Sequence, residues 1–358
     1  MIMQVFGAPG RYVQGAGAIA ELGGFLKPLG SRVLVTGGRN GLGETREARL
    51  TGLKGYGVEQ IEEPFRGETC FGEIDRIAGV AKSAGCDIML ASGGGKVIDA
   101  VKAAAESLDI PAVIVPTIAS NDAPCSALAV IYNQDGTFSR LMPLKKSPAL
   151  VIADTEIIAR SPVRQLVSGM GDALATWYEA DACHTSGGLN NFGGHASQAA
   201  LAIAKLCLET LLEHGREAAQ CCEKQQAAPA LEKVVEANIL LSGLGFESGG
   251  VAVAHALSES LTLIPSVHSR THGETVAFGL LVHMILAGSP EDELRVIKSF
   301  CADVGLPVTL LQLGCTDEVE LRAAAEDAAN PGKPSHNLRR GITGGEIFEA
   351  MMELRTES

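Results

Sequence analysis

The sequence predicts an α/β domain with a parallel sheet, followed by an all-helical domain. Up to about residue 160, short apolar segments with strand character alternate with amphipathic segments of helical period. This alternation is typical of parallel strands with helices on both faces of the sheet. Beyond residue 160 the segments are longer and helix-patterned, and glycine pairs separate them. We therefore expect two domains, residues 1–161 and residues 162–358, with the boundary near Ser161 and Pro162.

Local patterns place the individual elements. Strands are expected where short apolar runs end in glycine or polar turn residues, and helices where the apolar period lengthens. The Asp135-Gly136 pair separates two β-type runs, 126–132 and 138–144, and predicts a hairpin, because Asp-Gly favours the tight turn between antiparallel strands. The other predicted strands are 32–36, 57–62, 87–92, 111–115 and 149–154, and the predicted helices are 71–84, 96–107, 164–183, 196–214, 229–246, 251–261, 272–286 and 290–304.

Composition excludes several classes of protein. Of the 358 residues, 46% are hydrophobic and 20% are charged, which is typical of a globular enzyme. The formal net charge of −13 argues against a nucleic-acid partner, because no cationic stripe is available to neutralise phosphates. Nine cysteines without C-x-x-C spacing indicate reduced intracellular thiols. Neither a signal peptide nor an apolar run of transmembrane length is present in the sequence, so we expect a cytoplasmic protein without a membrane partner.

Two loops at the ends of predicted strands carry candidate ligand-binding residues. Residues 93–96 (Gly-Gly-Gly-Lys) follow one strand and open a helix, where free N–H groups and close backbone approach suit a phosphate. An isolated glycine run also serves as an ordinary strand–helix turn, and this run lacks the usual nucleotide-binding spacings, as does the run at 37–43. Residues 116–132 are rich in hydroxyls, with Asp122 as their only carboxylate. Because ligands of α/β proteins lie at the carboxyl ends of strands, the two loops predict a nucleotide beside a small polar substrate.

One aspartate and two histidines form a candidate metal site in the helical domain. Asp172 stands at a predicted helix start, His255 lies in an apolar helical segment, and His272 follows His268 by four residues. Taken singly, Asp172 is explained as a helix cap and His255 as a core histidine. Taken together, one carboxylate and two imidazoles on three helices of one domain match a catalytic divalent-metal site with open coordination positions.

The motifs occur in the order found in a known family. The chain resembles the glycerol dehydrogenases of the iron-containing, or group III, alcohol dehydrogenase superfamily. The resemblance extends over most of the chain and fades after Pro307. The matching pieces are residues 9–15, 93–96, 116–127, 171–180 and 245–250, His255, and residues 272–279.

The resemblance implies a role for each candidate residue. Asp172, His255 and His272 would bind the metal, with His255 and Asp122 at the catalytic centre and Asp122 bonded to the substrate. The iron enzymes of the superfamily carry a further histidine four residues after the aspartate, where this chain has Thr176. Three protein ligands favour zinc with open positions. The residues implied to contact the cofactor are Gly94, Gly95, Lys96, Thr117, Ser120, Ser126, Leu128 and Tyr132.

The implied fold is a Rossmann-like parallel-sheet domain plus an all-α domain, the dehydroquinate synthase-like or group III alcohol dehydrogenase fold. The implied reaction is the zinc-dependent oxidation of glycerol, or a related vicinal diol, by hydride transfer to the nicotinamide of NAD in the cleft between the domains. The resemblance also implies a homo-oligomer, commonly an octamer.

Three alternatives share parts of the pattern. A dehydroquinate synthase-like lyase and a glycerol-1-phosphate dehydrogenase act on phosphate-bearing substrates and need several cationic side chains near the metal. Between His255 and His272 only Arg270 is cationic, which disfavours both. A non-catalytic metal- or nucleotide-binding protein would require a damaged ligand set, whereas all three ligand residues are present.

The end of the first predicted strand departs from the family. Relatives commonly carry an acidic residue there, which binds the adenosine ribose and repels a 2′-phosphate. This chain has Gly38 followed by Arg39. We therefore expect weaker discrimination against NADP, with NAD still preferred.

Overall fold

The computed structural model describes residues 3–356 and contains one six-stranded parallel sheet, as the sequence predicts. The strand order is β1-β8-β5-β4-β2-β3, and every neighbouring pair is parallel. The strands are β1 (Tyr12–Gly15), β2 (Arg32–Gly37), β3 (Glu59–Pro64), β4 (Ile88–Gly93), β5 (Ala112–Pro116) and β8 (Leu150–Asp154). Strand β4 is buried along its whole length, which explains its continuous apolar run. The sequence analysis missed β1, a short strand at the sheet edge.

Helices cover both faces of this sheet, and two apolar clusters result. Val33 and Val35 of β2 point into the cluster under the first helices, whereas Leu34 between them points into the larger cluster on the opposite face. The antiparallel hairpin of β6 (Leu128–Tyr132) and β7 (Phe138–Pro143) is confirmed. The helices of this half are α1 (Leu22–Leu26), α2 (Arg39–Leu53), α3 (Phe71–Ser83), α4 (Gly95–Leu108) and α5 (Thr155–Ala159), with a 3₁₀ turn at Ala18–Glu21.

Most of the glycine run at 37–43 lies inside a helix. Helix α2 begins at Arg39, so Gly41 and Gly43 are helical residues. A Cβ at Gly41 would lie 2.4 Å from the carbonyl oxygen of Ser92, which shows that this turn of α2 packs directly on the end of β4.

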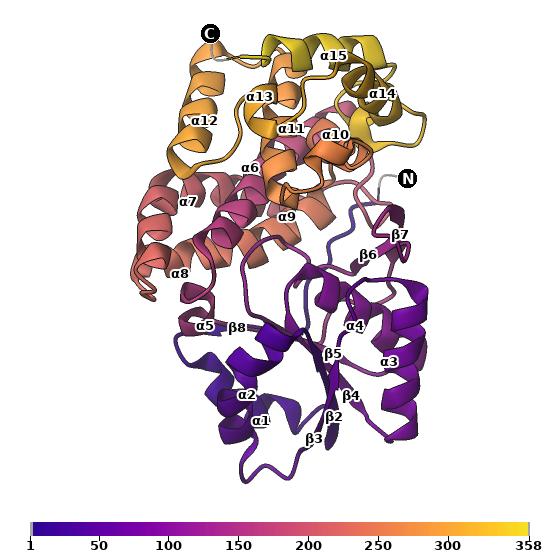
Figure 1. The fold of residues 1–358 in the computed structure, drawn as a ribbon, viewed down its shortest axis with the longest axis vertical. Helices are drawn as coiled ribbons and strands as arrows, with labels where there is room; N and C mark the ends of the chain where they lie inside the picture. Colours follow the sequence, from indigo (N-terminus) through magenta and orange to yellow (C-terminus); the bar gives the residue numbers. More distant parts are fainter. Residues whose placement is uncertain (1–2, 357–358) are drawn as a thin grey trace.

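The second half of the described chain consists of helices and their connections (Figure 1). Its helices are α6 (Val163–Ser186), α7 (Gln198–Glu223), α8 (Pro229–Glu236), a π-helical turn (Ala237–Leu241), α9 (Ser242–Gly249), α10 (Val253–Leu261), α11 (His272–Ala287), α12 (Glu291–Val304), α13 (Leu310–Leu313), α14 (Glu318–Ala328) and α15 (Gly344–Glu353), with 3₁₀ turns at Pro265–Val267 and Pro334–Asn337. Figure 1 shows these helices gathered at one end of the molecule and the sheet at the other.

Two helices differ most from their predictions. Helix α7 continues past Gly215, where the sequence suggested an end, and the ring of Phe300 packs where a side chain at Gly215 would lie. The helix predicted at 229–246 is interrupted by the π-helical turn and then continues to Gly249. Helices α13 to α15 lie beyond the last helix that the pattern indicated.

The segment before β1 contacts the helical half. The backbone N–H of Val5 donates to the carbonyl oxygen of His195 at 3.3 Å, and Asn190 Nδ2 donates to the Val5 carbonyl at 2.8 Å. The two halves are therefore joined by the start of the chain as well as by the α5–α6 connection.

No single helix within residues 3–356 is long and apolar enough to cross a membrane. The pair Pro229–Gly249 and Val253–Leu261, which is bent by 104°, has the length and composition of a span only when its two parts are taken together.

Helices α6 and α11 cross at direct backbone contact. A Cβ at Gly273 would lie 1.6 Å from the carbonyl oxygen of Ser168, and a Cβ at Gly171 would lie 2.3 Å from that of Gly273. Real atoms do not approach so closely, and the obstructing atoms belong to backbone that cannot swing aside. Glycine is therefore required at both positions for the two helices to meet as they do.

We predict that Gly273→Ala lowers the free energy of unfolding by about 3 kcal/mol, because the added methyl group forces α6 and α11 apart. Urea denaturation measures the change. Gly79→Ala is the matched control, since Gly79 is exposed in α3 with no atom within 4 Å of its added Cβ. It should be neutral or stabilising by up to about 1 kcal/mol. Equal denaturation midpoints for Gly273→Ala and wild type would show that the crossing tolerates a side chain.

Candidate metal and active site

The structure brings the three predicted metal ligands together. Asp172 lies inside α6, His255 in the first turn of α10, and His272 at the start of α11. Asp172 Oδ1 is 3.2 Å from His255 Nε2 and 3.2 Å from His272 Nε2, and the three donor atoms all lie within 4.8 Å of one another. Because Asp172 lies well inside α6, its interpretation as a helix cap is wrong. The His272 side chain is 47% exposed, so the cluster is open to solvent on one side.

The charges of this cluster are mutually stabilising. Burial by itself would raise the pKa of Asp172, but the imidazoles of His272 and His255 outweigh it and hold that pKa below its ordinary value. Burial by itself would lower the pKa of His255, but the carboxylates of Glu179 and Asp172 raise it well above the usual range. One carboxylate oxygen and two imidazole nitrogens at this spacing fit the donor set of a divalent transition metal.

Glu179 orients His255 and was not predicted as a site residue. Its Oε2 accepts a hydrogen bond from His255 Nδ1, and its Oε1 accepts from the backbone N–H groups of Ala252 (2.8 Å) and His255 (3.0 Å). The carboxylate is fully buried. Its bond to Nδ1 leaves Nε2 directed at Asp172, which is how outer carboxylates fix metal-binding imidazoles. Glu179 follows Asp172 by seven residues, two helical turns along α6, and that spacing is the signal that could have revealed it.

Asp122 lies beside the ligand cluster, on the loop that follows β5. Its Oδ2 accepts a hydrogen bond from Ser242 Oγ at 2.8 Å, and its backbone N–H lies 3.4 Å from Asp172 Oδ2. Burial and the neighbouring Asp172 carboxylate raise the pKa of Asp122 well above its ordinary value. Thr176 faces the same network through its contact with Ser242 Oγ at 2.9 Å. The loop after β5 thus carries a carboxyl group to the edge of the cluster of three candidate ligands.

A buried lysine holds this loop in shape. Lys102 of α4 places its ammonium 2.9 Å from Asp99 Oδ1, and the same group donates to the carbonyl oxygens of Ala123 (2.9 Å) and Ser126 (3.3 Å) and to that of Leu128. Two residues predicted to contact the cofactor, Ser126 and Leu128, are therefore fixed from the sheet side. The sequence analysis missed Lys102 because its acceptors are backbone atoms that only the folded loop presents.

The predicted phosphate loop packs against the same segment. Gly94 immediately precedes α4 and Gly95 begins it, so the free N–H groups of the helix start are available to an anion. A Cβ at Gly95 would lie 2.7 Å from Asn121 Nδ2, and one at Gly94 would lie 2.6 Å from Ile118 Cδ1. Side chains of the loop after β5 therefore pack directly against both glycines.

Lys96 and Tyr132 lie together at the outer end of this region. Lys96 Nζ is 2.6 Å from Glu68 Oε2 and 5.7 Å from the centre of the Tyr132 ring. Burial, and then the charge of Asp99, raise the pKa of Tyr132 to about 12, so its hydroxyl stays neutral. Glu68 was not predicted as a site residue. Its carboxylate would compete with a phosphate for the Lys96 ammonium.

Thr117 and Ser120 complete the predicted cofactor set. The Thr117 N–H donates to the Gly93 carbonyl at 3.2 Å, which joins the two loops, and the Ser120 carbonyl accepts from Ser168 Oγ at 3.1 Å. All eight predicted cofactor residues therefore lie at the start of α4 or on the segment from β5 to β6. His268 lies outside the cluster, because its Nε2 contacts the Thr262 carbonyl at 2.8 Å.

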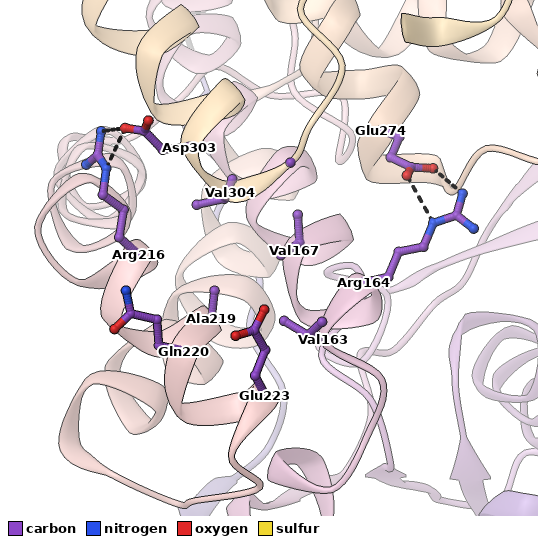
Figure 2. Close-up of a pocket in the computed structure, with 11 residues that line it drawn as sticks. Val163, Arg164, Val167, Arg216, Ala219, Gln220, Glu223, Glu274, Asp303 and Val304 are labelled. Atoms are coloured by element: carbon purple, nitrogen blue, oxygen red, sulfur yellow. Dashed lines mark hydrogen bonds and ion pairs between the residues drawn. The ribbon is translucent and has the colours of Figure 1, made fainter.

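A groove of about 600 Å³ in the helical half is separate from the cluster of candidate ligands (Figure 2). Arg164, Arg216, Glu274 and Asp303 line it, and Figure 2 shows two ion pairs, Arg164–Glu274 and Arg216–Asp303. None of the three ligand residues is among its lining residues.

The chain is similar to known proteins in sequence and in fold. Residues 9–155 match the model of the iron-containing alcohol dehydrogenase family. A glycerol dehydrogenase of Escherichia coli O6:H1 is 46% identical over 98% of this chain and 96% of its own length. A probable glycerol dehydrogenase structure from Sinorhizobium meliloti has a TM-score of 0.92 at 38% identity, covering 98% of each chain. The Schizosaccharomyces pombe glycerol dehydrogenase structure has a TM-score of 0.95 at 34% identity, covering 99% of this chain and 91% of its own.

The resemblance in the sequence motifs is thereby confirmed in both sequence and fold. It covers nearly the full length and continues past Pro307, so the expectation that it fades there is wrong. The chain belongs to the iron-containing alcohol dehydrogenase family and is an alcohol oxidoreductase.

Proposed function

We propose that this protein oxidises the secondary hydroxyl of glycerol, forming dihydroxyacetone, with NAD⁺ as the hydride acceptor and zinc as the bound metal. The observation that carries the proposal is the placement of Asp122 beside the Asp172–His255–His272 cluster, on the loop that also holds the predicted cofactor residues. Glycerol as the substrate is supported by the names of the full-length relatives. The balanced reaction is glycerol + NAD⁺ → dihydroxyacetone + NADH + H⁺.

The residues around the cluster fit a three-ligand zinc site. Thr176 faces Ser242 and is no histidine, so Asp172, His255 and His272 would be the protein ligands. Zinc bound there would supply Lewis-acid chemistry, lowering the pKa of the substrate hydroxyl. Glu179 holds the His255 ring in one orientation, and the exposed side at His272 leaves a path for the substrate.

Asp122 would orient the polyol. Its carboxyl group can accept hydrogen bonds from glycerol hydroxyls, and Ser242 already fixes one of its oxygens. The loop around it is held by Lys102 and Ser168, so little reorganisation is needed when the substrate binds. We further propose that the pyrophosphate of NAD lies at Gly94, Gly95 and Lys96, with Thr117, Ser120, Ser126, Leu128 and Tyr132 around the rest of the cofactor.

The alternatives with phosphate-bearing substrates lack support. Arg270, the one cationic residue between the two histidines, donates its Nε–H to the Leu313 carbonyl at 2.9 Å, so its guanidinium is engaged by α13. The compared proteins that cover nearly the whole chain at high identity are glycerol dehydrogenases. We also propose a cytoplasmic homo-oligomer, whose size analytical ultracentrifugation would establish.

The decisive experiment measures NADH formation from glycerol and NAD⁺ by purified protein, with elemental analysis of the bound metal. We predict one zinc per subunit and loss of turnover in His272→Ala, with NADH binding retained because the cofactor residues lie on other elements. His268→Ala is the control, since this histidine lies four residues away and outside the cluster. Active protein with stoichiometric iron and no zinc would contradict the metal assignment.

A second prediction concerns Asp122. Asp122→Asn should lower kcat/KM for glycerol by about 10–100-fold, because the amide presents a donor where a carboxyl oxygen would accept, and a buried polar group left unpaired costs about 1–3 kcal/mol. The Kd for NADH, measured by fluorescence, should change less than twofold. If cofactor affinity falls as much as diol kinetics, Asp122 maintains the loop and does not bind the substrate.

A third prediction concerns cofactor choice. Gly38 precedes α2 with φ −68°, and no atom lies within 4 Å of an added Cβ, so an aspartate fits there without strain. Gly38→Asp should raise the ratio of kcat/KM for NAD to that for NADP by about tenfold, equivalent to about 1.4 kcal/mol. Gly43→Asp adds the same charge further along α2 at an exposed glycine and should leave the ratio unchanged. An unchanged ratio in Gly38→Asp would mean that the ribose is recognised elsewhere.

A further inference from the structure

One face of α6 contacts the first turn of α11. Arg164, Ser168, Gly171 and Asp172 are spaced so that they share this face. Ser168 Oγ accepts from the Gly273 N–H at 3.3 Å, and Asp172 meets His272 at the far end of the row. Arg164 occupies the near end. The start of α11, which carries a predicted metal ligand, is therefore positioned in part by α6.

Arg164 binds the residue that caps α11. Its Nε donates to Glu274 Oε1 at 3.0 Å and its Nη2 to Glu274 Oε2 at 2.8 Å, a two-point ion pair. The same Nη2 donates to the Ser269 carbonyl at 2.9 Å, in the segment that leads to His272. Glu274 also accepts from the Thr271 N–H at 2.6 Å, while Thr271 Oγ1 accepts from the Glu274 N–H at 3.4 Å. One carboxylate thus starts the helix and attaches it to α6.

His272 depends on this attachment more than the other ligands do. Asp172 is buried, and Glu179 holds His255, whereas the His272 side chain is 47% exposed and stands at the very start of its helix. Metal ligands must be held to a few tenths of an ångström, so a shift in the first turn of α11 would weaken the site.

We propose that Arg164 is a positioning residue of the metal centre, acting through Glu274 to hold His272 at bonding distance from a metal shared with Asp172. The inference rests on the proposed function in so far as the cluster binds a metal. It adds a role for a side chain in the groove of Figure 2, outside the cluster itself.

The same groove supplies a matched control. Arg216 of α7 pairs with Asp303 of α12 through two contacts of 2.8 Å, and Figure 2 shows both pairs on opposite sides of the groove. The two arginines are similarly exposed, 53% for Arg164 and 45% for Arg216. The helices joined by Arg216 carry none of the three predicted ligands. A comparison of variants at Arg164 and Arg216 therefore separates the effect of losing the Arg164–Glu274 pair from the effect of losing any ion pair in this groove.

The test measures the zinc affinity of metal-free protein by competition with a chromophoric chelator. We expect Arg164→Gln to bind zinc about tenfold more weakly than wild type, the lower end of the effect of removing a direct partner of a metal ligand, because Arg164 acts through Glu274. Arg164→Lys should lie between the two, because an ammonium cannot make the two-point contact. Arg216→Gln should bind as wild type does. Thermal melts of the metal-free proteins show that each variant is folded, and the lysine variant serves if the glutamine variant is not.

The zinc affinities distinguish failure of the positioning role from failure of the proposed function. Wild-type zinc affinity in Arg164→Gln, or an equal loss in Arg216→Gln, overturns the positioning role and leaves the proposed function intact. A wild-type protein that binds no divalent cation overturns both. NADH affinity should be the same in all four proteins, because the predicted cofactor residues lie on other elements.

Discussion

The backbone contact between α6 and α11 is the constraint on which the candidate site depends. Gly171 and Gly273 meet where a Cβ on either would strike the other helix, and the residues adjacent to them are Asp172 and His272. The helices can approach so closely only because both contact positions lack side chains. Two ligands from distant parts of the chain are brought to 3.2 Å by this single crossing.

The crossing also reaches the sheet. Ser168 accepts a hydrogen bond from Gly273 and donates one to the Ser120 carbonyl, so the loop after β5 is attached to both helices at once. Asn238, in the π-helical turn, donates to the Ala119 carbonyl at 3.0 Å. Such turns widen a helix locally and redirect its side chains, and they occur often at functional sites. The loop with the predicted cofactor and substrate residues therefore packs against the helices that carry the candidate metal ligands.

Buried polar side chains in this region have short polar contacts. Lys102 contacts Asp99, Glu179 accepts from the Ala252 N–H, and Asp122 accepts from Ser242, because an unpartnered polar or charged group inside a protein would be destabilising. These contacts restrict the loop and the His255 ring to one arrangement. Hydride transfer between two bound molecules requires such restriction, since the reacting atoms must be close and aligned.

Local sequence patterns were sufficient for most of the fold and for selecting the candidate metal ligands by residue type. Alternating strands and helices, the Asp135-Gly136 hairpin, and the apolar periods of the long helices depend on neighbours in the chain, so the sequence by itself determined them. Asp172, His255 and His272 could be selected by residue type, and the family resemblance gave them roles.

Only the tertiary structure decided how these pieces meet. Strand β1 exists because it pairs with β8, and Gly215 lies inside α7 with the Phe300 ring packed against it. Lys102 and Arg164 have no local motif, and the spacing of Glu179 from Asp172 along α6 does not by itself show what Glu179 binds. Each of the three acts on atoms brought near by the fold, which are the His255 ring for Glu179, the Leu128 carbonyl for Lys102 and the Glu274 carboxylate for Arg164. The physical reason is that ligand chemistry belongs to single side chains, whereas ligand geometry depends on contacts between residues tens to more than a hundred positions apart.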